Sequence, residues 1–479
     1  MVFSSTVFLF LFFPLVLLGY FIIPRQARNV FLLLASLFFY AWGEGFYLLI
    51  MLASILLNYS GGRLLDRFRG QQSGKIVLFV TLAANLLLLG TFKYANFLVD
   101  NLNIVLGVVG VSPLLLAPVH LPIGISFFTF QAMSYVIDVY RDDAVVQKNP
   151  FNTALYIALF PQLIAGPIVR YHDIAEQLTS RRETLDLFTS GIILFVIGLG
   201  KKMLLANQMG AVADGIFAIA PSQLDAPLSW LGIICYTLQI YFDFSGYSDM
   251  AIGLGRMFGF QFLINFNYPY ISRSIREFWQ RWHISLSRWF RDYLYIPLGG
   301  GRGANWQVYR NLFIVFFLCS LWHGASWNFV VWGMIHGTFL VLERTRLGSL
   351  LAVCPRLLRH FYVLLIVMLS WVFFRSPDIG YGWQYLSAMF GFGSGDGITH
   401  YVFQYLNREV LLVIVFGVAT ATPIMPFVRT RLEERKILEY GWVQFFVSGA
   451  TITVLILIIV GSTMHLAAGT HNPFIYFRF

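Results

Sequence analysis

The stretch Asn311-Leu-Phe-Ile-Val-Phe-Phe-Leu-Cys-Ser-Leu321 runs directly into Trp322-His323-Gly324, so an almost wholly apolar run ends in a histidine. Similar runs, many of them near the roughly 20 residues that cross a hydrocarbon layer, recur from one end of the chain to the other. Only 12% of the 479 residues are charged and 58% are hydrophobic, which leaves too little charge to cover a soluble protein of this length. The sequence therefore predicts an all-α, polytopic integral membrane protein.

The positions of the apolar runs predict the membrane spans. They lie at about 6–23, 29–43, 46–59, 76–99, 121–140, 151–169, 187–206, 227–246, 309–325, 327–343, 357–374, 408–427 and 444–467. The segment 104–119 is apolar but contains two glycines and two prolines, which favours an interfacial or re-entrant segment. Because several runs are expected to be half-buried, we predict about 11 full spans. No soluble domain is apparent, so residues 1–479 are predicted to form a single membrane domain.

Basic residues indicate the orientation of the chain. The net charge of +10 is spread over short loops, so no nucleic-acid partner is predicted. Arg25 and Arg28 lie in the first loop and further basic residues in the third, whereas the second loop, around Glu44, has none. This pattern predicts cytoplasmic first and third loops and an N-terminus outside. The first run, Thr6 to Ile23, lacks a preceding basic region and a cleavage site, so we expect it to be retained as a span.

The three cysteines carry no recognisable chemistry. Cys235, Cys319 and Cys354 are scattered at or near apolar segments, without the spacing of a metal site or of a disulfide framework. We interpret all three as packing residues and predict no metal site.

Residues 240–310 depart from the composition of a lipid-facing segment. The run Ile240 to Met250, with the sequence IYFDFSGYSDM, ends an apolar span with Asp243 and Asp249. A carboxylate at membrane depth is costly and usually faces a protein interior or a watery cavity. The alternative is that both carboxylates lie beyond the span, at the level of the lipid headgroups, and the sequence leaves the two interpretations open.

Two histidines flank a glycine-rich turn at equal distances. Residues 276–292 predict a helix, rich in Trp and Arg, that ends near Pro297 and suits an interface or a protein-lined recess. His283 and His323 each lie 20 residues from the centre of the turn near residue 303. If both arms are helical and antiparallel, the imidazoles come to a similar depth, roughly 20 Å from the turn. A lone histidine there favours a structural role, whereas a matched pair favours acid–base chemistry on a hydroxyl or a thiolate.

Six stretches taken together resemble the membrane-bound O-acyltransferase (MBOAT) superfamily. They are residues 1–5 (MVFSS), 121–127 (LPIGISF), 160–167 (FPQLIAGP), 241–249 (YFDFSGYSD), 277–298 and 321–336. The chain is most similar to the bacterial branch that contains alginate O-acetyltransferases, D-alanyl transfer proteins and peptidoglycan O-acetyltransferases. The resemblance covers most of the chain and implies helices around a thinner centre. It also implies a tunnel from a cytoplasmic acyl-CoA site to the outer face.

The resemblance also implies roles for individual residues, with residues 240–340 as the catalytic core. The histidine of the family's Trp-His-Gly motif is catalytic and matches His323, and a second tunnel residue about 40 positions upstream matches His283. His323 is expected to act as general base, with His283 orienting the acyl group or protonating the thiolate. Other residues expected near the tunnel or in support of the pair are Asp243, Asp249, Trp279, Ser287, Trp322 and His336. Arg281, Arg288 and Arg291 are expected to meet either CoA phosphates or lipid headgroups.

The expected reaction moves an acetyl group outward. Acetyl-CoA is the expected donor substrate, with no permanently bound cofactor, because a thioester drives ester formation without ATP once donor and hydroxyl are held together. The expected acceptor is an exported polysaccharide, alginate first, with cellulose and peptidoglycan left open. The expected location is the bacterial cell inner membrane. Besides membrane lipids, the expected partners are periplasmic acetyltransferases of the SGNH, AlgJ/AlgX-like kind.

The C-terminal segment 472–479, NPFIYFRF, has two interpretations. It is an aromatic interfacial anchor, or it resembles the Phe-x-Tyr-Phe acyl-carrier tail of this transfer system. In the second case Tyr476 relays acetyl to a partner serine, because a phenol leaves more readily than an alkyl hydroxyl. The relay requires the tail to lie outside, and hence an even number of spans.

Two other classes of protein compete with an enzyme. Intramembrane His and Asp residues also mark the ion paths of transporters and channels, although no inverted repeat or paired broken helices are apparent. A scaffold that only recruits secreted partners is the third class. The three classes differ in one property, because only the enzyme consumes acetyl-CoA.

Overall fold

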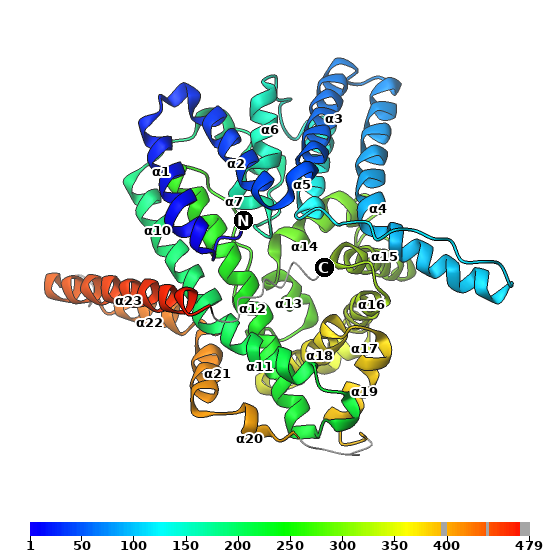
Figure 1. Ribbon diagram of the computed structural model, residues 1–479, viewed down its shortest axis with the longest axis vertical. Coiled ribbons are helices and arrows are strands. Elements are labelled where there is room, and N and C mark those ends of the chain that lie inside the picture. The colour runs from blue at the N-terminus through cyan, green and yellow to red at the C-terminus, as the bar shows by residue number, and fades with distance from the viewer. Residues whose placement is uncertain (394–399, 437–439, 470–479) are drawn as a thin grey trace. The chain divides into compact units, whose positions relative to one another are not determined.

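The computed structural model describes residues 1–393, 400–436 and 440–469, and every regular element in these ranges is a helix (Figure 1). The described chain packs into two compact units. Unit 1 comprises residues 1–192 and 251–263, and unit 2 comprises residues 193–250 together with the chain from 264 onward. The predicted all-α class is confirmed, whereas the prediction that residues 1–479 act as a single domain stays a prediction.

The helices of unit 1 come mainly from the first part of the chain. They are η1 (Phe8–Phe12), α1 (Phe13–Ile22), η2 (Arg25–Ala27), α2 (Arg28–Glu44), η3 (Gly45–Tyr47), α3 (Leu48–Arg67), α4 (Gln72–Val108), α5 (Ile125–Arg141), α6 (Pro150–Ala158), α7 (Phe160–Leu163), α8 (Tyr171–Ile174) and α9 (Gln177–Ser180). The beginning of α10 (Leu185–Gly200) and the end of α12 (Ala226–Met257) also belong to it.

Unit 2 contains the rest of α10 and α12 and the helices that follow. They are η4 (Lys201–Ala206), α11 (Asn207–Phe217), η5 (Pro221–Gln223), η6 (Pro269–Ile271), α13 (Ile275–Arg281), α14 (Ile284–Phe290), η7 (Arg291–Tyr295), α15 (Asn305–His323), α16 (Trp327–Leu342), α17 (Arg346–Val353), α18 (Arg356–Arg375), α19 (Ile379–Met389), α20 (Val402–Tyr405), α21 (Arg408–Thr420), α22 (Ile424–Glu434) and α23 (Gly441–Ala467).

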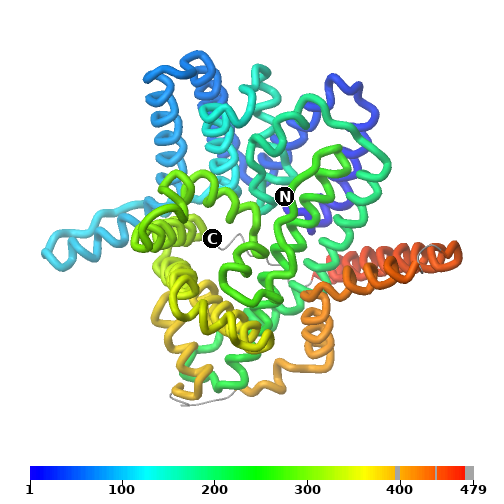
Figure 2. Tube along the Cα trace, turned by 180° about the vertical axis from the view of Figure 1, so that it is seen from behind, coloured from blue at the N-terminus to red at the C-terminus, as the bar shows by residue number. Residues whose placement is uncertain are grey.

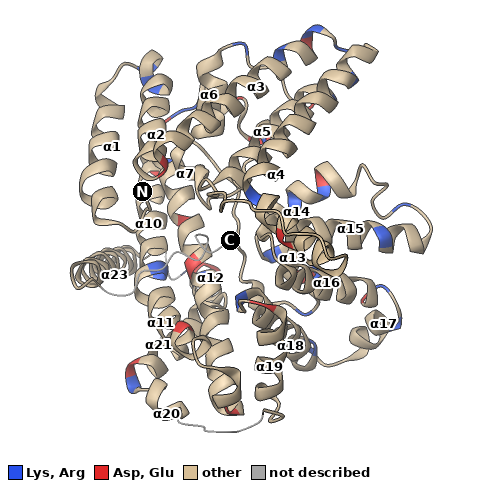
Figure 3. Ribbon diagram, turned by 45° about the vertical axis from the view of Figure 1, so that its right-hand side comes forward, with Lys and Arg blue, Asp and Glu red and all other residues tan. Residues whose placement is uncertain are grey.

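Long apolar helices agree with the polytopic membrane character of the chain. Five helical stretches are long and apolar enough to cross a membrane: Arg25–Arg67, Gln72–Val108, Leu185–Phe217, Arg356–Arg375 and Gly441–Ala467. A sixth results if α21 and α22, which are bent by 50°, count as one. Charged side chains gather mostly at helix ends and in loops (Figure 3). The described residues thus supply fewer spans of this kind than predicted, and the count of 11 is not confirmed.

Several predicted spans are interrupted. The run 151–169 is divided into α6 and α7 at Leu159, whose ψ of 112° leaves the helical region just before Pro161. The run 408–427 breaks between α21 and α22 at Pro423, because a proline restricts the preceding residue and has no N–H to continue the helix. Residues 104–108 extend α4, and no regular element covers residues 111–122. Hydropathy alone therefore overestimates the length of these helices.

Helix α5 forms the centre of unit 1. All residues from Ile125 to Val139 are buried, and α5 packs against α3, α4 and α6. The helix begins after Gly124, which has φ +77°. Only glycine fits at this position, because a Cβ would lie 2.7 Å from the Leu163 carbonyl oxygen. At the other end of the chain, in unit 2, only 6% of the most apolar 18-residue window of α23 is buried. Figure 2 shows this helix in red, projecting from the helices that precede it.

Within unit 2, α10 and α12 approach each other closely through two glycines. A Cβ on Gly198 would lie 2.5 Å from the Gly246 carbonyl oxygen, and a Cβ on Gly246 would lie 2.7 Å from the Gly198 carbonyl oxygen. Small residues at a helix contact let backbones approach in this way in membrane proteins. The close contact places the start of η4 beside the middle of α12.

Two ion pairs result from this contact. Lys201 Nζ lies 2.6 Å from Asp249 Oδ2, and Lys202 Nζ lies 2.7 Å from Asp243 Oδ1. The second pair is almost completely buried, with side-chain exposures of 2% for Lys202 and 1% for Asp243. A charge in such an environment is tolerated only when it is paired, so the two pairs hold α12 in one register against η4.

The variant Lys202→Met tests whether the buried Asp243 carboxylate depends on its cationic partner. It leaves Asp243 buried without its cation, and we expect the free energy of unfolding to fall by about 3–5 kcal/mol. The measurement is the Tm of the purified full chain in detergent. The double variant Lys202→Met/Asp243→Leu should recover most of the loss, because two apolar side chains leave no unpaired charge. Equal instability of the single and double variants would show that an unpaired charge is not the cause of the loss.

Candidate active site

His323 is the last residue of α15, and its position depends on the glycine that follows. Gly324 ends the helix in an extended conformation, and a Cβ at this position would overlap the ring of Phe329. The glycine of the Trp-His-Gly sequence therefore allows the chain to turn from α15 into α16 while Phe329 packs against it. The two helices form a tight hairpin, and His323 lies at its buried end with 5% of its surface exposed.

His283 lies at a break between two short helices. The continuous helix predicted over 276–292 is wrong, because α13 ends at Arg281 and α14 begins at Ile284. His283 between them has φ +43°, a left-handed conformation that is uncommon for a residue with a side chain. The break exists because Ile284 N donates to the Asn265 carbonyl oxygen at 2.9 Å, so a distant residue, and not the preceding turn, receives this N–H.

The structure brings the two histidines together. Their ring centroids lie 6.4 Å apart, with an angle of 64° between the ring planes, and His283 is completely buried. Both residues belong to unit 2, and the contact expected from their equal spacing about the turn is present. The contact is reached through the left-handed bend at His283, however, and not through two uninterrupted helices.

The side chain of Asn265 determines which nitrogen of His283 carries the proton. Asn265 Nδ2 donates to Ser248 Oγ at 2.9 Å, and Asn265 Oδ1 accepts from Ser285 N and Ser285 Oγ at 3.2 and 2.9 Å. These contacts identify Oδ1 as the acceptor, so His283 Nδ1, 3.1 Å away, is the donor. In a neutral imidazole Nε2 then carries the lone pair. Within the described part of the chain Nε2 makes no hydrogen bond, so it is the nitrogen that remains for a reacting group.

Aromatic rings surround the pair. Phe244 lies 4.6 Å from the His283 ring in an edge-on arrangement, and Trp322 contacts both histidines at centroid distances of 6.0 and 5.0 Å. Trp332 and Phe374 lie 5.0 and 5.5 Å from His323. Such an enclosure excludes water and strengthens the electrostatic interactions of any group held there.

His336 is engaged at both ring nitrogens. Its Nδ1 accepts from Trp279 Nε1 at 3.3 Å, and its Nε2 lies 3.0 Å from Ser370 Oγ. Because the Ser370 hydroxyl already donates to the Val367 carbonyl oxygen, His336 Nε2 is the donor to it. The predicted residues His336 and Trp279 thus belong to one hydrogen-bonded chain beside the histidine pair. Both nitrogens of His336 are engaged in this chain.

The predicted carboxylates lie away from the histidines' hydrogen bonds. Asp243 is buried in the protein interior with Lys202, and Asp249 is half-buried with Lys201, so the headgroup interpretation does not describe Asp243. On α12, Asp243 precedes Phe244, which contacts His283. Asp249 follows Ser248, whose hydroxyl accepts from Asn265. The carboxylates therefore act on the position of α12.

The predicted arginines have different surroundings. Arg281 pairs with Glu277 at 2.9 Å, and Arg291 pairs with Asp292 at 2.6 Å, so each has a carboxylate partner. Arg288 is half-buried and has no ion pair within residues 1–393, 400–436 and 440–469. Arg291 also lines an apolar pocket of about 160 Å³, together with Trp279 and Ser287. Tyr476 lies outside the described residues.

Sequence reasoning missed the residues that hold the pair in place. Asn265 stands in the irregular segment Ile264-Asn265-Phe266-Asn267, which carries no helical or motif signal. Lys202 offered a signal, because two adjacent lysines, 201 and 202, interrupt a predicted span and require partners at membrane depth. In the described ranges, no three His, Cys, Asp or Glu side chains come together as metal ligands would.

Comparison with known proteins identifies the family. The sequence profile of the membrane-bound O-acyltransferase family, MBOAT, matches residues 44–374, which include both histidines. The chain belongs to the membrane-bound O-acyltransferase family. Like other members it is an O-acyltransferase of the membrane, and the buried histidine pair lies within the matched region.

Relatives along the whole chain refine this assignment. Over the full length of both proteins the chain is 42% identical to the probable alginate O-acetylase AlgI of Azotobacter vinelandii and 40% identical to that of Pseudomonas aeruginosa. It is 33% identical to the peptidoglycan O-acetyltransferase of Helicobacter pylori, covering all of this chain and 98% of the relative. The resemblance to the bacterial polymer-modifying branch of MBOAT proteins, expected from six short stretches, is confirmed.

The variant Asn265→Ala tests whether the amide positions His283. Loss of the acceptor for His283 Nδ1 should lower the rate of acyl transfer roughly 10- to 100-fold, a part of what a general acid or base contributes. Asn265→Asp keeps an acceptor at this place and should retain more activity than the alanine variant. The assay is acetyl transfer by membranes that contain equal amounts of each protein.

Asn267→Ala is the matched control for this series. Asn267 is exposed two residues away, and its contacts with Arg281 use only the Asn267 backbone. It should behave as the wild type. Full activity of Asn265→Ala would show that His283 does not depend on this hydrogen bond.

Proposed function

We propose that this protein takes acetyl from cytoplasmic acetyl-CoA and passes it across the bacterial inner membrane for O-acetylation of an exported polysaccharide, with alginate as the first candidate. The observation that carries the proposal is the buried histidine pair, with ring centroids 6.4 Å apart inside an aromatic enclosure. The choice of alginate is supported by two full-length relatives named as probable alginate O-acetylases. Peptidoglycan and cellulose are the alternatives.

We assign complementary roles to the two histidines, and the role of His283 follows from the proton on its Nδ1. His323 takes the proton from the acceptor hydroxyl as its oxygen attacks the thioester carbonyl. The C–S bond then breaks, the thiolate of CoA leaves, and the imidazolium of His323 returns the proton to it, so CoA-SH and an O-acetyl ester are the products. With its proton on Nδ1, neutral His283 accepts a hydrogen bond at Nε2 and does not donate one there. It therefore stabilises the positive charge of His323, or orients the hydroxyl, and is not the donor to the thiolate.

The enclosure of the pair accounts for transfer in place of hydrolysis. Water competes with any hydroxyl for a thioester, and the rings of Phe244, Trp322, Trp332 and Phe374 occupy the space around the imidazoles. The acceptor is then either the polymer hydroxyl itself or a hydroxyl that carries acetyl onward, such as Tyr476 and a serine of a periplasmic SGNH-type acetyltransferase.

The variant His323→Ala tests the proposal directly. We expect no detectable O-acetyl on the exported polysaccharide, because the variant lacks the proposed general base, and His283→Ala should lower the O-acetyl content at least tenfold. The measurement is NMR of the exported polymer from cells with equal membrane amounts of each protein. His465→Ala, at a half-buried histidine of α23 whose Nδ1 lies 3.4 Å from Gln208 Nε2, is the control and should leave acetylation unchanged. Normal acetylation by His323→Ala would remove His323 from the catalytic role.

Consumption of acetyl-CoA separates the enzyme from its rivals. The full chain reconstituted in vesicles with labelled acetyl-CoA should release CoA when acceptor is present, and His323→Ala should not. A transporter or a scaffold consumes no acetyl-CoA. If the wild-type protein left the labelled acetyl-CoA unconsumed, although cells with this protein acetylate the polymer normally, the result would favour those classes.

The variant Tyr476→Phe examines the relay. If Tyr476 carries acetyl, removal of its hydroxyl should abolish polymer acetylation while acetyl-CoA binding persists. Tyr440→Phe, at an exposed tyrosine elsewhere, is the control and should be fully active. Full activity of Tyr476→Phe would contradict the relay and support direct transfer to the acceptor.

A further inference from the structure

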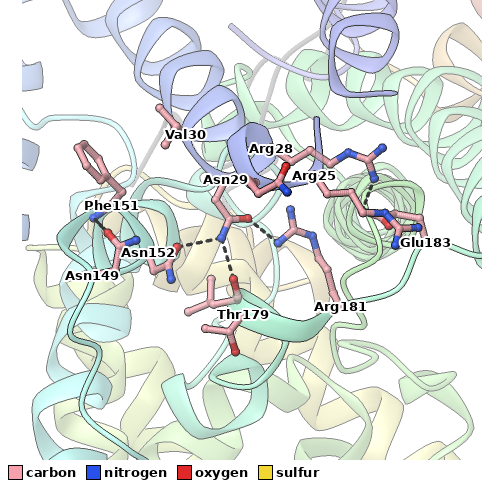
Figure 4. A pocket seen from close by; sticks show the side chains of 12 residues that line it. Arg25, Arg28, Asn29, Val30, Asn149, Phe151, Asn152, Thr179, Arg181 and Glu183 are labelled. Atoms are coloured by element: carbon pink, nitrogen blue, oxygen red, sulfur yellow. Dashed lines mark hydrogen bonds and ion pairs between the residues drawn. The ribbon is translucent and has the colours of Figure 1, made fainter. Parts of the chain in front are cut away.

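Unit 1 contains a polar cavity that the transfer reaction does not use. It has a volume of about 360 Å³ and lies where α2 and α6 begin and where the segment after α9 passes them (Figure 4). Three arginines line it, Arg25, Arg28 and Arg181, together with one glutamate, Glu183. The cavity wall therefore carries an excess of positive charge.

Most of the wall is fixed by contacts within the protein. Glu183 Oε1 accepts from Arg28 at 2.9 Å and from the Tyr20 hydroxyl at 2.5 Å, so the one carboxylate already has two donors. Arg181 donates to Asn29 Oδ1 at 2.6 Å and to the Phe258 carbonyl oxygen at 3.0 Å. Guanidinium groups held in this way lose little conformational freedom when a ligand binds, which favours binding of an anion.

Further donors point to an anion as the ligand. Asn29 donates to Asn152 Oδ1 at 2.8 Å (Figure 4). The Nδ2 atom of Asn152 is therefore a donor at the cavity wall. The first turns of α2 and α6 also meet at the cavity, and helix N-termini carry partial positive charge. Arg25 is exposed and, within the described ranges, has no ion pair, so its charge is available to a ligand.

The surroundings of the cavity indicate a lipid. Phe151 and Val30, which line it, are 52% and 36% exposed, and Ile22 and Leu34, a few residues along the chain from the wall, are 72% and 60% exposed. Exposed apolar residues beside a basic cavity are the pattern expected where hydrocarbon meets headgroups. Arg25 and Arg28 belong to the first loop, which the distribution of basic residues predicts to be cytoplasmic.

We propose that this cavity binds the phosphate of an anionic phospholipid from the cytoplasmic leaflet, with Arg25 and Arg28 as its cationic contacts. The acyl chains then lie along the exposed apolar side chains of α1, α2 and α6. Bound lipid ties the beginning of α2 to that of α6, and it does so independently of the histidine pair, which belongs to unit 2.

Native mass spectrometry of the purified full chain tests the proposal. The protein is titrated with phosphatidylglycerol or with phosphatidylcholine of the same acyl chains. The wild type should retain phosphatidylglycerol more tightly, and Arg25→Gln should weaken its binding about fivefold, the effect of one basic side chain near an anionic headgroup. Arg25→Lys keeps the charge and should retain most of the affinity. Arg67→Gln, an exposed arginine at the end of α3, removes the same charge elsewhere and should have no effect.

Competition with inorganic phosphate distinguishes a lipid headgroup from free phosphate as the source of the bound anion. If the lipid is the ligand, millimolar phosphate should not displace phosphatidylglycerol, because it lacks the acyl chains. Displacement by free phosphate at concentrations similar to the lipid's would overturn the lipid assignment. Equal affinities for the two lipids, or equal losses in Arg25→Gln and Arg67→Gln, would overturn the site itself.

Discussion

The side chain of Asn265 is the constraint on which the geometry of the histidine pair depends. Its Oδ1 receives three donors, one from His283 and two from Ser285, while its Nδ2 donates to Ser248. In a buried site each of these bonds costs about 1–3 kcal/mol to leave unmade. The amide thereby assigns the proton to Nδ1 and leaves Nε2 for a reacting group, while the backbone carbonyl of the same residue accepts from Ile284 N at the helix break.

The buried ion pairs of unit 2 act on the histidine pair indirectly, through the position of α12. Gly198 and Gly246 let α10 and α12 approach, and the pairs that Lys202 and Lys201 form with the carboxylates of α12 then define its register. Ser248 and Phe244 on α12 consequently meet Asn265 and His283. Ion pairs at membrane depth are usually suspected of moving ions, but here they are matched one to one and explain the position of a helix.

Parts of the fold and of the site could be predicted because they depend on local composition. Apolar runs predict the all-α membrane class, and the equal spacing of His283 and His323 about one turn predicts that they meet. The helix over 276–292 was nevertheless wrong at His283, and the span over 151–169 was wrong at Leu159. In both places the backbone follows a contact with a remote segment: Ile284 N bonds to Asn265, and Phe160 N bonds to Ser36.

The sequence by itself determined that this protein lies in a membrane, that its family transfers acyl groups and that His283 and His323 are the candidate catalytic residues. These conclusions rest on run length, motif and spacing, which are properties of neighbouring residues. Only the tertiary structure decided that Asn265, 18 residues from His283, sets its tautomer, and that Arg181, 152 residues from Asn29, closes a basic cavity. Hydrogen bonds of this kind form only after helices pack, because packing alone brings residues distant in the chain within about 3 Å.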